Sequence, residues 1–181
     1  MMNKNVRIPL WLCEFHGEEA SVFSLLATYA TGTILGLYAY LSASVPEGWR
    51  TWLICGLAID IGGGVVANMS KSTTIYYAAR PKLRWFFILL HLIHPFLLGL
   101  VYGESWILVV GATTLLFTAT VNYLHGRENQ RIVAGSLTLI NFVIIYSLLE
   151  NKLLLLLLTC YSVKLIVAFA IRWNDTTAAL S

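Results

Sequence analysis

Six long apolar stretches constrain the fold of this chain more than any other feature. They cover residues 20–41, 51–69, 85–102, 106–124, 132–149 and 153–173. Each is close to the ~20 residues that a helix needs to cross the ~30 Å hydrocarbon core of a bilayer. The sequence therefore predicts an all-α integral membrane protein, folded as a six-helix transmembrane bundle. The leucine-rich run at residues 153–158 is interpreted as helix surface that faces lipid.

The composition agrees with this fold class and excludes several others. Only 12% of the residues are charged and 58% are hydrophobic, whereas about a quarter of a soluble domain is charged. The net charge of +3 is too small to suggest a nucleic-acid partner. Three widely spaced cysteines, Cys13, Cys55 and Cys160, match neither a disulfide framework nor a zinc motif. We interpret them as small apolar side chains.

Polarity divides the chain into three parts. Residues 1–19 mix acids, bases and aromatic side chains, and we expect either a short segment at the membrane surface or a plain cytoplasmic lead-in. His16 in this part is expected to be solvated. Residues 20–173 form the transmembrane domain, and residues 174–181 are a polar cytoplasmic tail.

Basic residues gather on one side of the predicted bundle. That side holds Lys4, Arg7, Lys71, Arg80, Lys82, Arg84, Arg127, Arg131 and Arg172. The opposite side holds only Arg50 and Lys152. Because loops rich in Lys and Arg stay on the cytoplasmic side, we predict that both termini are cytoplasmic (N-in, C-in). The chain is expected to be a multi-pass protein of the cell membrane, with the lipid bilayer as its main partner.

A basic loop is predicted between the second and third helices, at residues 70–84. Pro81 is expected to stop any helix that enters it. Its basic side chains lie close to the predicted cytoplasmic face, where anionic lipid headgroups attract them. We therefore expect Arg80 and Arg84 to bind an anionic headgroup.

Five polar side chains occupy apolar helices at similar depth. At ~1.5 Å of rise per residue, Asp60, His91, His94, Lys164 and Asn141 all lie roughly 10–16 Å from the inner ends of their helices. A charge at this depth costs at least ~2.5–3.5 kcal/mol unless it is paired or faces water. We therefore expect these groups to meet.

The ionisable members of this set are the candidate catalytic residues. Asp60 and Lys164 can neutralise each other. His91 and His94 are three residues apart, on one face of a helix that Pro95 should kink. Together with Asp60 they could hold a divalent metal, provide a general base or relay protons. A histidine pair is a weak metal signal without a third histidine, and His125 lies too near the predicted interface to serve easily. We therefore predict no metal site and name no cofactor.

Candidate substrate-binding residues lie on the same helices and on the basic loop. Asp60, Gly64 and Asn68 share one helical face. The glycines at residues 62–64 indicate either close packing of the backbone or a local break around a ligand. The candidates are Gly63, Gly64, Asn68, Asn141, Arg80 and Arg84.

Three functions are compatible with these residues. The first is a membrane-embedded enzyme that acts on a lipid or other apolar substrate. The second is a small proton-coupled transporter or permease subunit, expected to form a homodimer through the small-residue stripe of Thr28, Gly32 and Gly36. The third is a structural or assembly protein with no catalytic role. A polar site that faces a cavity favours the first two, and a dry, filled core favours the third.

Overall fold

The computed structural model describes residues 4–42 and 44–171, and it is mainly helical. Six helical segments are long and apolar enough to cross a membrane. They are Val22–Leu41 (α2), Trp49–Met69 (α3), Pro81–Tyr102 (α5 and α6), Trp106–Tyr123 (α7), Gln130–Leu148 (α8) and Lys152–Phe169 (α9 and η2). The all-α bundle is confirmed at this level. The predicted tail at residues 174–181 lies outside the described residues.

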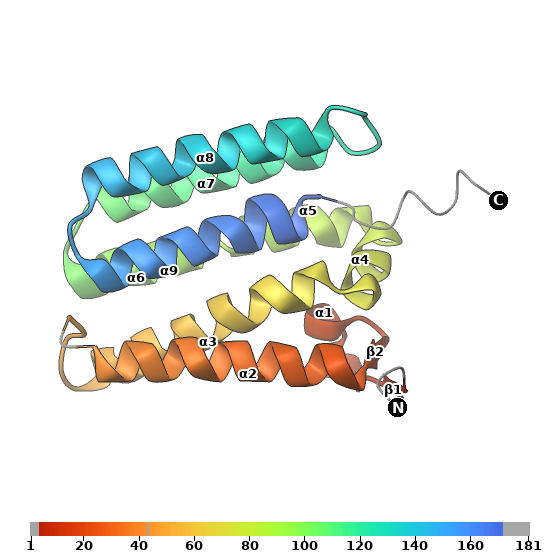
Figure 1. Cartoon of the computed structure of the whole chain (residues 1–181), viewed down its shortest axis with the longest axis horizontal. Coiled ribbons are helices and arrows are strands. Elements are labelled where there is room, and N and C mark those ends of the chain that lie inside the picture. The colour runs from red at the N-terminus through yellow and green to blue at the C-terminus, as the bar shows by residue number, and fades with distance from the viewer. Residues whose placement is uncertain (1–3, 43, 172–181) are drawn as a thin grey trace.

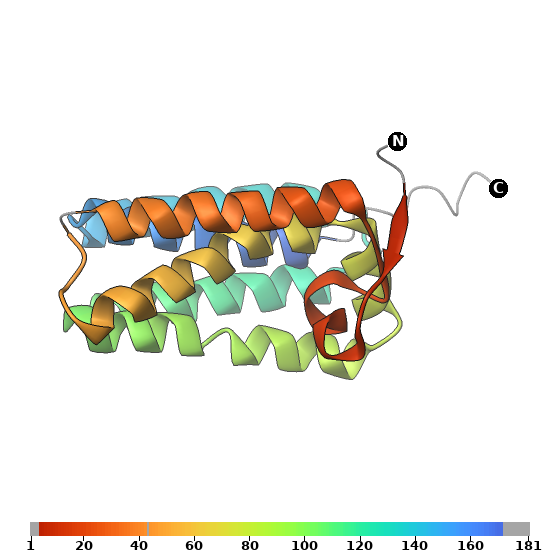
Figure 2. The same cartoon turned by 90° about the horizontal axis from the view of Figure 1, so that it is seen from below.

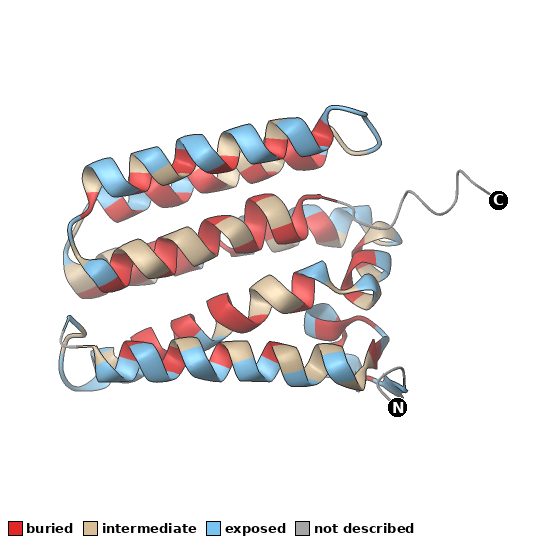
Figure 3. Ribbon diagram, viewed as in Figure 1, coloured by how far each residue is buried: buried red, intermediate tan, exposed pale blue. Residues whose placement is uncertain are grey.

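The helices run alternately up and down, so their connections gather at two ends (Figure 1). The N-terminal strands, α4 and the connection between α7 and α8 share one end. The last helical segment packs against α3, α7 and α8, and its surface is largely buried (Figure 3). The predicted lipid-facing leucine run is therefore wrong, because Leu153, Leu154, Leu157 and Leu158 are fully buried. Their burial against three neighbouring helices builds the centre of the bundle.

The small-residue stripe of α2 packs against α3 within the same chain. A Cβ atom on Gly32 would lie 2.8 Å from the Ile59 carbonyl oxygen, and one on Gly36 would lie 2.5 Å from the Ile59 side chain. From the other side, a Cβ atom on Gly63 would lie 3.1 Å from the Thr28 carbonyl oxygen. The expected dimer surface is thus already covered. Gly63 allows the same close approach of α2 and α3. Helix α3 continues through its glycines without a break.

The predicted loop at residues 70–84 is mostly helical, which corrects the sequence interpretation. Helix α4 spans Lys71–Ala78, and Ser70 caps it by accepting a hydrogen bond from the backbone N–H of Thr73. Helix α5 spans Pro81–Leu90. Pro81 occupies its first turn, where a missing N–H has no cost. Pro81 therefore starts a helix.

The N-terminal residues fold against α4. Strands β1 (Asn5–Arg7) and β2 (Glu19–Ser21) pair antiparallel, and they enclose the short helices η1 (Leu10–Leu12) and α1 (Cys13–His16). Figure 2 shows this segment covering one end of the bundle.

Two hydrogen bonds and one glycine attach α1 to α4. The Tyr77 hydroxyl donates to the Glu14 carbonyl oxygen at 3.0 Å, and the Thr73 hydroxyl donates to the Phe15 carbonyl oxygen at 3.3 Å. Gly17, at φ +75°, packs directly on Ser72. The expectation of a solvated His16 is wrong, because this side chain is buried. Burial lowers the pKa of His16.

The third membrane-length segment is broken near the predicted kink. Helix α6 spans Ile93–Tyr102, so His91 and Leu92 interrupt the helix between α5 and α6. Pro95 has no N–H to donate to the carbonyl group four residues before it, on His91. The Tyr161 hydroxyl donates to that carbonyl oxygen instead, at 2.8 Å. At the break, the His91 carbonyl oxygen therefore accepts from the last helix and also from the His94 N–H, at 3.2 Å.

Gly111 on α7 lets that helix approach the break, and we expect Gly111→Ala to lower the free energy of unfolding by about 1–3 kcal/mol. The new Cβ atom would lie 2.2 Å from Cβ of Pro95, whose ring cannot rotate away. Gly135→Ala is the matched control, because a Cβ atom there would meet nothing within 4 Å. Thermal unfolding in detergent micelles measures the difference. Equal stability of the two variants would contradict the close approach.

Candidate functional site

Three of the four candidate catalytic side chains meet at one carboxylate oxygen. Oδ2 of Asp60, on α3, lies 2.5 Å from Nε2 of His94 on α6 and 2.5 Å from Nζ of Lys164 on η2. The same Nζ donates to the Asp60 carbonyl oxygen at 3.3 Å. The predicted Asp60–Lys164 ion pair is therefore confirmed.

Burial differs sharply across this pair. The Lys164 side chain is only 3% exposed, whereas that of Asp60 is 35% exposed. An enclosed ammonium group is costly unless a partner compensates for its lost hydration, and the carboxylate supplies that compensation. The carboxylate, in turn, faces open space on one side.

The second histidine is held by its own helix. Nδ1 of His91 lies 2.7 Å from the Phe87 carbonyl oxygen. Because a carbonyl oxygen only accepts, Nδ1 carries the proton and Nε2 keeps its lone pair. The rings of His91 and His94 stack, with centroids 4.9 Å apart and planes 7° apart. His91 therefore presents a free basic nitrogen beside the pair formed by Asp60 and His94.

Two features of the backbone bring Lys164 to Asp60. Residues Val163–Phe169 form a π-helix (η2), a widened turn that occurs frequently at functional sites. Opposite it, a Cβ atom on Gly64 would lie 2.3 Å from Cε and 2.8 Å from Nζ of Lys164. Because Gly64 has no side chain, it leaves room for the lysine side chain to cross α3. Asn68, one turn further, donates to the Lys164 carbonyl oxygen at 3.4 Å.

The cluster lines a cavity of about 320 Å³. Lys164, His91 and His94 are buried and form its inner wall. Phe15 of α1, with Leu90 and Ile93 of the broken helix, also lines it, and these three are about half exposed. The lining is completed by Glu14, Asp60, Gly64, Ala67, Asn68, Tyr77 and Phe87. The cavity therefore has a polar inner end and a mainly apolar rim, to which the exposed carboxylate of Glu14 also belongs.

Sequence reasoning missed the residues that hold and border the cluster. Phe87 lies one turn before His91, and Tyr161 lies three residues before Lys164. Those spacings place each pair on one helical face and could have indicated the contacts. Nothing in the sequence pattern indicated that Glu14 and Phe15 would fold back over the cavity.

Tyr161→Phe is expected to lower the free energy of unfolding by about 1 kcal/mol, because it removes one of the two donors to the His91 carbonyl oxygen, the other being the His94 N–H. Tyr146→Phe, at an exposed position on α8, is the control and should leave stability unchanged. Chemical denaturation of the purified variants measures both effects. A Tyr161→Phe variant as stable as wild type would show that the hydroxyl contact contributes nothing.

Asn141 belongs to a different polar cluster, which corrects its place in the predicted site. Its side-chain amide is buried and donates to the Thr114 hydroxyl at 2.8 Å and to the Ser162 hydroxyl. These contacts join α7, α8 and α9, and Asn141 does not line the cavity. Its depth matches that of Asp60, but its helical face points elsewhere.

Headgroup binding had led us to expect Arg84 on the surface of a loop. The structure places its side chain inside the bundle instead. It is 3% exposed. Its guanidinium group donates to the side chain of Asn122 and to the carbonyl oxygens of Phe169 and Ala170, the last two at 2.5 and 3.1 Å. Arg84 therefore satisfies carbonyl groups at the C-terminal end of η2, where a cation is favourable.

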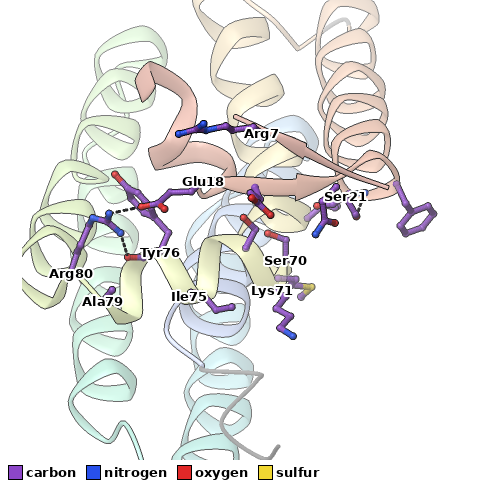
Figure 4. A pocket seen from close by; sticks show the side chains of 16 residues that line it. Arg7, Glu18, Ser21, Ser70, Lys71, Ile75, Tyr76, Ala79 and Arg80 are labelled. Atoms are coloured by element: carbon purple, nitrogen blue, oxygen red, sulfur yellow. Dashed lines mark hydrogen bonds and ion pairs between the residues drawn. The ribbon is translucent and has the colours of Figure 1, made fainter. Parts of the chain in front are cut away.

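Arg80 borders a larger hollow of about 970 Å³ between the N-terminal strands and α4 (Figure 4). Its guanidinium group lies 2.6 Å from Oε1 of Glu18 and donates to the Tyr76 carbonyl oxygen at 3.1 Å. Arg7 and Lys71 point in other directions and do not converge on it (Figure 4). Headgroup binding by Arg80 stays a prediction, and it would compete with Glu18.

Comparison of the chain with protein-family models, with curated proteins and with solved structures finds no match.

Proposed function

We propose that the chain is a multi-pass integral membrane protein whose cavity is the reacting centre of an enzyme for a lipid or another apolar substrate. One observation carries the proposal. Asp60, His91, His94 and Lys164 gather at a cavity with a mainly apolar rim, midway along helices of membrane length.

The arrangement of the helix ends supports a membrane orientation with both termini cytoplasmic. The N-terminal strands, α4 and the connection between α7 and α8 lie at one end of the bundle (Figure 1). These segments and the residues next to them hold seven of the twelve basic residues of the chain, namely Lys4, Arg7, Lys71, Arg80, Lys82, Arg127 and Arg131. Segments rich in basic residues stay on the cytoplasmic side.

The shape of the cavity suits an apolar substrate. Phe15, Leu90 and Ile93 would contact its hydrocarbon part at the rim, and the polar inner end would contact the group that reacts. Burial of apolar surface contributes ~25 cal/mol per Å². This contribution would favour a substrate bound with its hydrocarbon part at the rim over one bound the other way round. A lipid could reach the rim directly from the surrounding bilayer.

The chemistry that fits this set is proton transfer. Nε2 of His91, with its free lone pair, would accept a proton from the substrate or from a water molecule, and return it to the product. Asp60 would orient His94, as a carboxylate beside an imidazole does in other sites. Lys164 would balance the charge of the carboxylate within the apolar surroundings.

A purely structural cluster is less compatible with the burial pattern. Groups that only fix helix register are expected to be enclosed, as Asn141 is at 0% exposure. The Asp60 side chain is 35% exposed beside the cavity. Proton-coupled transport is the second candidate, because Asp60 contacts both a lysine and a histidine, as a proton relay requires.

Mass spectrometry of a total lipid extract, incubated with the protein in nanodiscs, tests the enzyme proposal. Wild type should convert at least one lipid species over time. The double variant Asp60→Asn/Lys164→Met, which removes both charges together, should convert none. Glu150→Gln, an exposed carboxylate between α8 and α9, is the control and should behave as wild type.

Identical lipid profiles for wild type and the double variant would overturn the enzyme proposal. Uptake into proteoliposomes that depends on an imposed proton gradient, and on the same two residues, would then support the transporter.

A further inference from the structure

We propose that Asp60, His91 and His94 bind a divalent transition-metal ion such as Zn²⁺, through one carboxylate oxygen and one nitrogen of each imidazole. The proposal rests on the proposed function, because it supplies a cofactor for the same centre. One ligand atom from each residue lies within 4.8 Å of the other two. Ligands of tetrahedral zinc lie roughly 3.3 Å apart, given bonds of ~2.0–2.2 Å. Small side-chain rotations would close that difference.

His91 is already oriented as a metal ligand. Its Nδ1–H donates to the Phe87 carbonyl oxygen, and metal-bound histidines almost always make such a bond with their second nitrogen. The bond fixes the tautomer and leaves the lone pair on Nε2 for a metal ion. The residue is 5% exposed, so this orientation is enforced by its surroundings.

His94 offers a second, independent observation. The residue is only 8% exposed, and its Nδ1 is buried. This nitrogen has no hydrogen-bond partner among residues 4–42 and 44–171. A buried polar atom without a partner requires an explanation. Coordination of a metal ion through Nδ1 would supply one.

The partial exposure of Asp60 leaves room for a fourth ligand. Catalytic zinc sites keep three protein ligands and one open position for water or substrate. Here the three ligands line the same cavity, so the open position would face the space that the substrate occupies. The sequence offers no third histidine at the depth of His91 and His94, and the carboxylate of Asp60 on another helix takes that place.

Lys164 acts in this proposal as a built-in competitor of the metal. Its Nζ lies 2.5 Å from Oδ2 of Asp60, so two cations would share one carboxylate or one would leave. Like charges at this separation repel. Removal of the lysine charge should therefore strengthen metal binding, whereas removal of a ligand should weaken it.

Zinc titration of the full-length protein, purified in detergent and treated with a chelator, tests the proposal. Isothermal calorimetry should give one Zn²⁺ per chain for wild type, and at least a ~10-fold lower Kd for Lys164→Met. His91→Gln and His94→Gln should each raise the Kd at least ~10-fold, since even weaker, outer-sphere changes have that effect. His16→Gln, a histidine outside the cavity, is the control and should bind as wild type.

Co²⁺ provides a second readout, because its visible absorption reports the coordination geometry. Intense bands of tetrahedral Co²⁺ in wild type, lost in the two histidine variants, would support the site. Failure of both wild type and Lys164→Met to bind one ion per chain would overturn it, whether or not the histidine variants fold. Lipid conversion in the chelator-treated protein would then still support the proposed function, with imidazole alone as the base.

Discussion

Asp60→Asn is expected to lower the free energy of unfolding by about 3–5 kcal/mol, which is the usual effect of leaving a buried charge without its partner. The ammonium group of Lys164 is 3% exposed and would keep only uncharged acceptors, namely the backbone carbonyl oxygen of residue 60 and the amide oxygen of the new side chain. Lys164→Met should cost less, because the Asp60 carboxylate is 35% exposed and retains its contact with His94. The asymmetry follows from the different burial of the two partners.

The double variant Asp60→Asn/Lys164→Met should recover most of the stability that Asp60→Asn loses. Replacing both members of a buried ion pair by neutral groups of similar volume is often close to neutral. Thermal and denaturant unfolding of the four proteins in one detergent gives the coupling free energy directly. Additive effects of the two substitutions, with no coupling, would show that the pair does not form in solution.

Gly64→Ala should displace Lys164 from Asp60, with an expected cost of about 1–3 kcal/mol for the overpacking. The added Cβ atom would lie 2.3 Å from Cε of Lys164. The lysine tail is flexible and can move, but only by leaving the carboxylate. The variant should therefore also lose the lipid conversion expected of wild type.

Gly56→Ala is the matched control on the same helix, because a Cβ atom there would meet nothing within 4 Å. It should be neutral or stabilising by up to ~1 kcal/mol, the gain in helix propensity of alanine over glycine. Unfolding and lipid conversion are measured side by side for both variants. Equal behaviour of the two would mean that Lys164 does not cross α3 at Gly64.

The helices and the approximate depth of the polar groups could be predicted because both follow from simple rules. A helix satisfies its own backbone hydrogen bonds in an apolar medium, so the apolar stretches mark the segments closely. A constant rise per residue places Asp60 and Lys164 at similar depth. Their pairing then follows from the cost of isolated charge.

Rotation about the helix axis could not be predicted in this way. Asn141 has the same depth as Asp60, yet it bonds to Thr114 and Ser162 on another face of the bundle. Arg84 follows a proline near the basic end and resembles a surface cation, but it enters the bundle and contacts the last helix. Only the packing of neighbouring helices determines these directions.

Local departures from regular helix geometry could not be predicted from the sequence either. The π-helix around Lys164 depends on the partners that the widened turn meets, and no residue pattern marks it. The fold of α1 over the cavity depends on contacts with Tyr77 and Thr73, which lie about sixty residues away in sequence. By contrast, Pro95 marked the break in the third segment, because its missing N–H acts locally.

The proposed chemistry depends on access from outside to the cavity that the ionisable groups line. Thiol labelling tests it most directly, because a cysteine reacts only as the thiolate and so requires access to water. In a variant whose Cys13, Cys55 and Cys160 are alanine, Ala67→Cys would place a thiol on the cavity wall. Ala58→Cys would place one in the filled core of the same helix.

A small methanethiosulfonate reagent, added to the protein in nanodiscs, should modify Ala67→Cys at least ~10-fold faster than Ala58→Cys, as the thiolate requirement implies. Equal protection of the two thiols would contradict the account, because Asp60, His91, His94 and Lys164 would then lie in a closed core that no substrate enters.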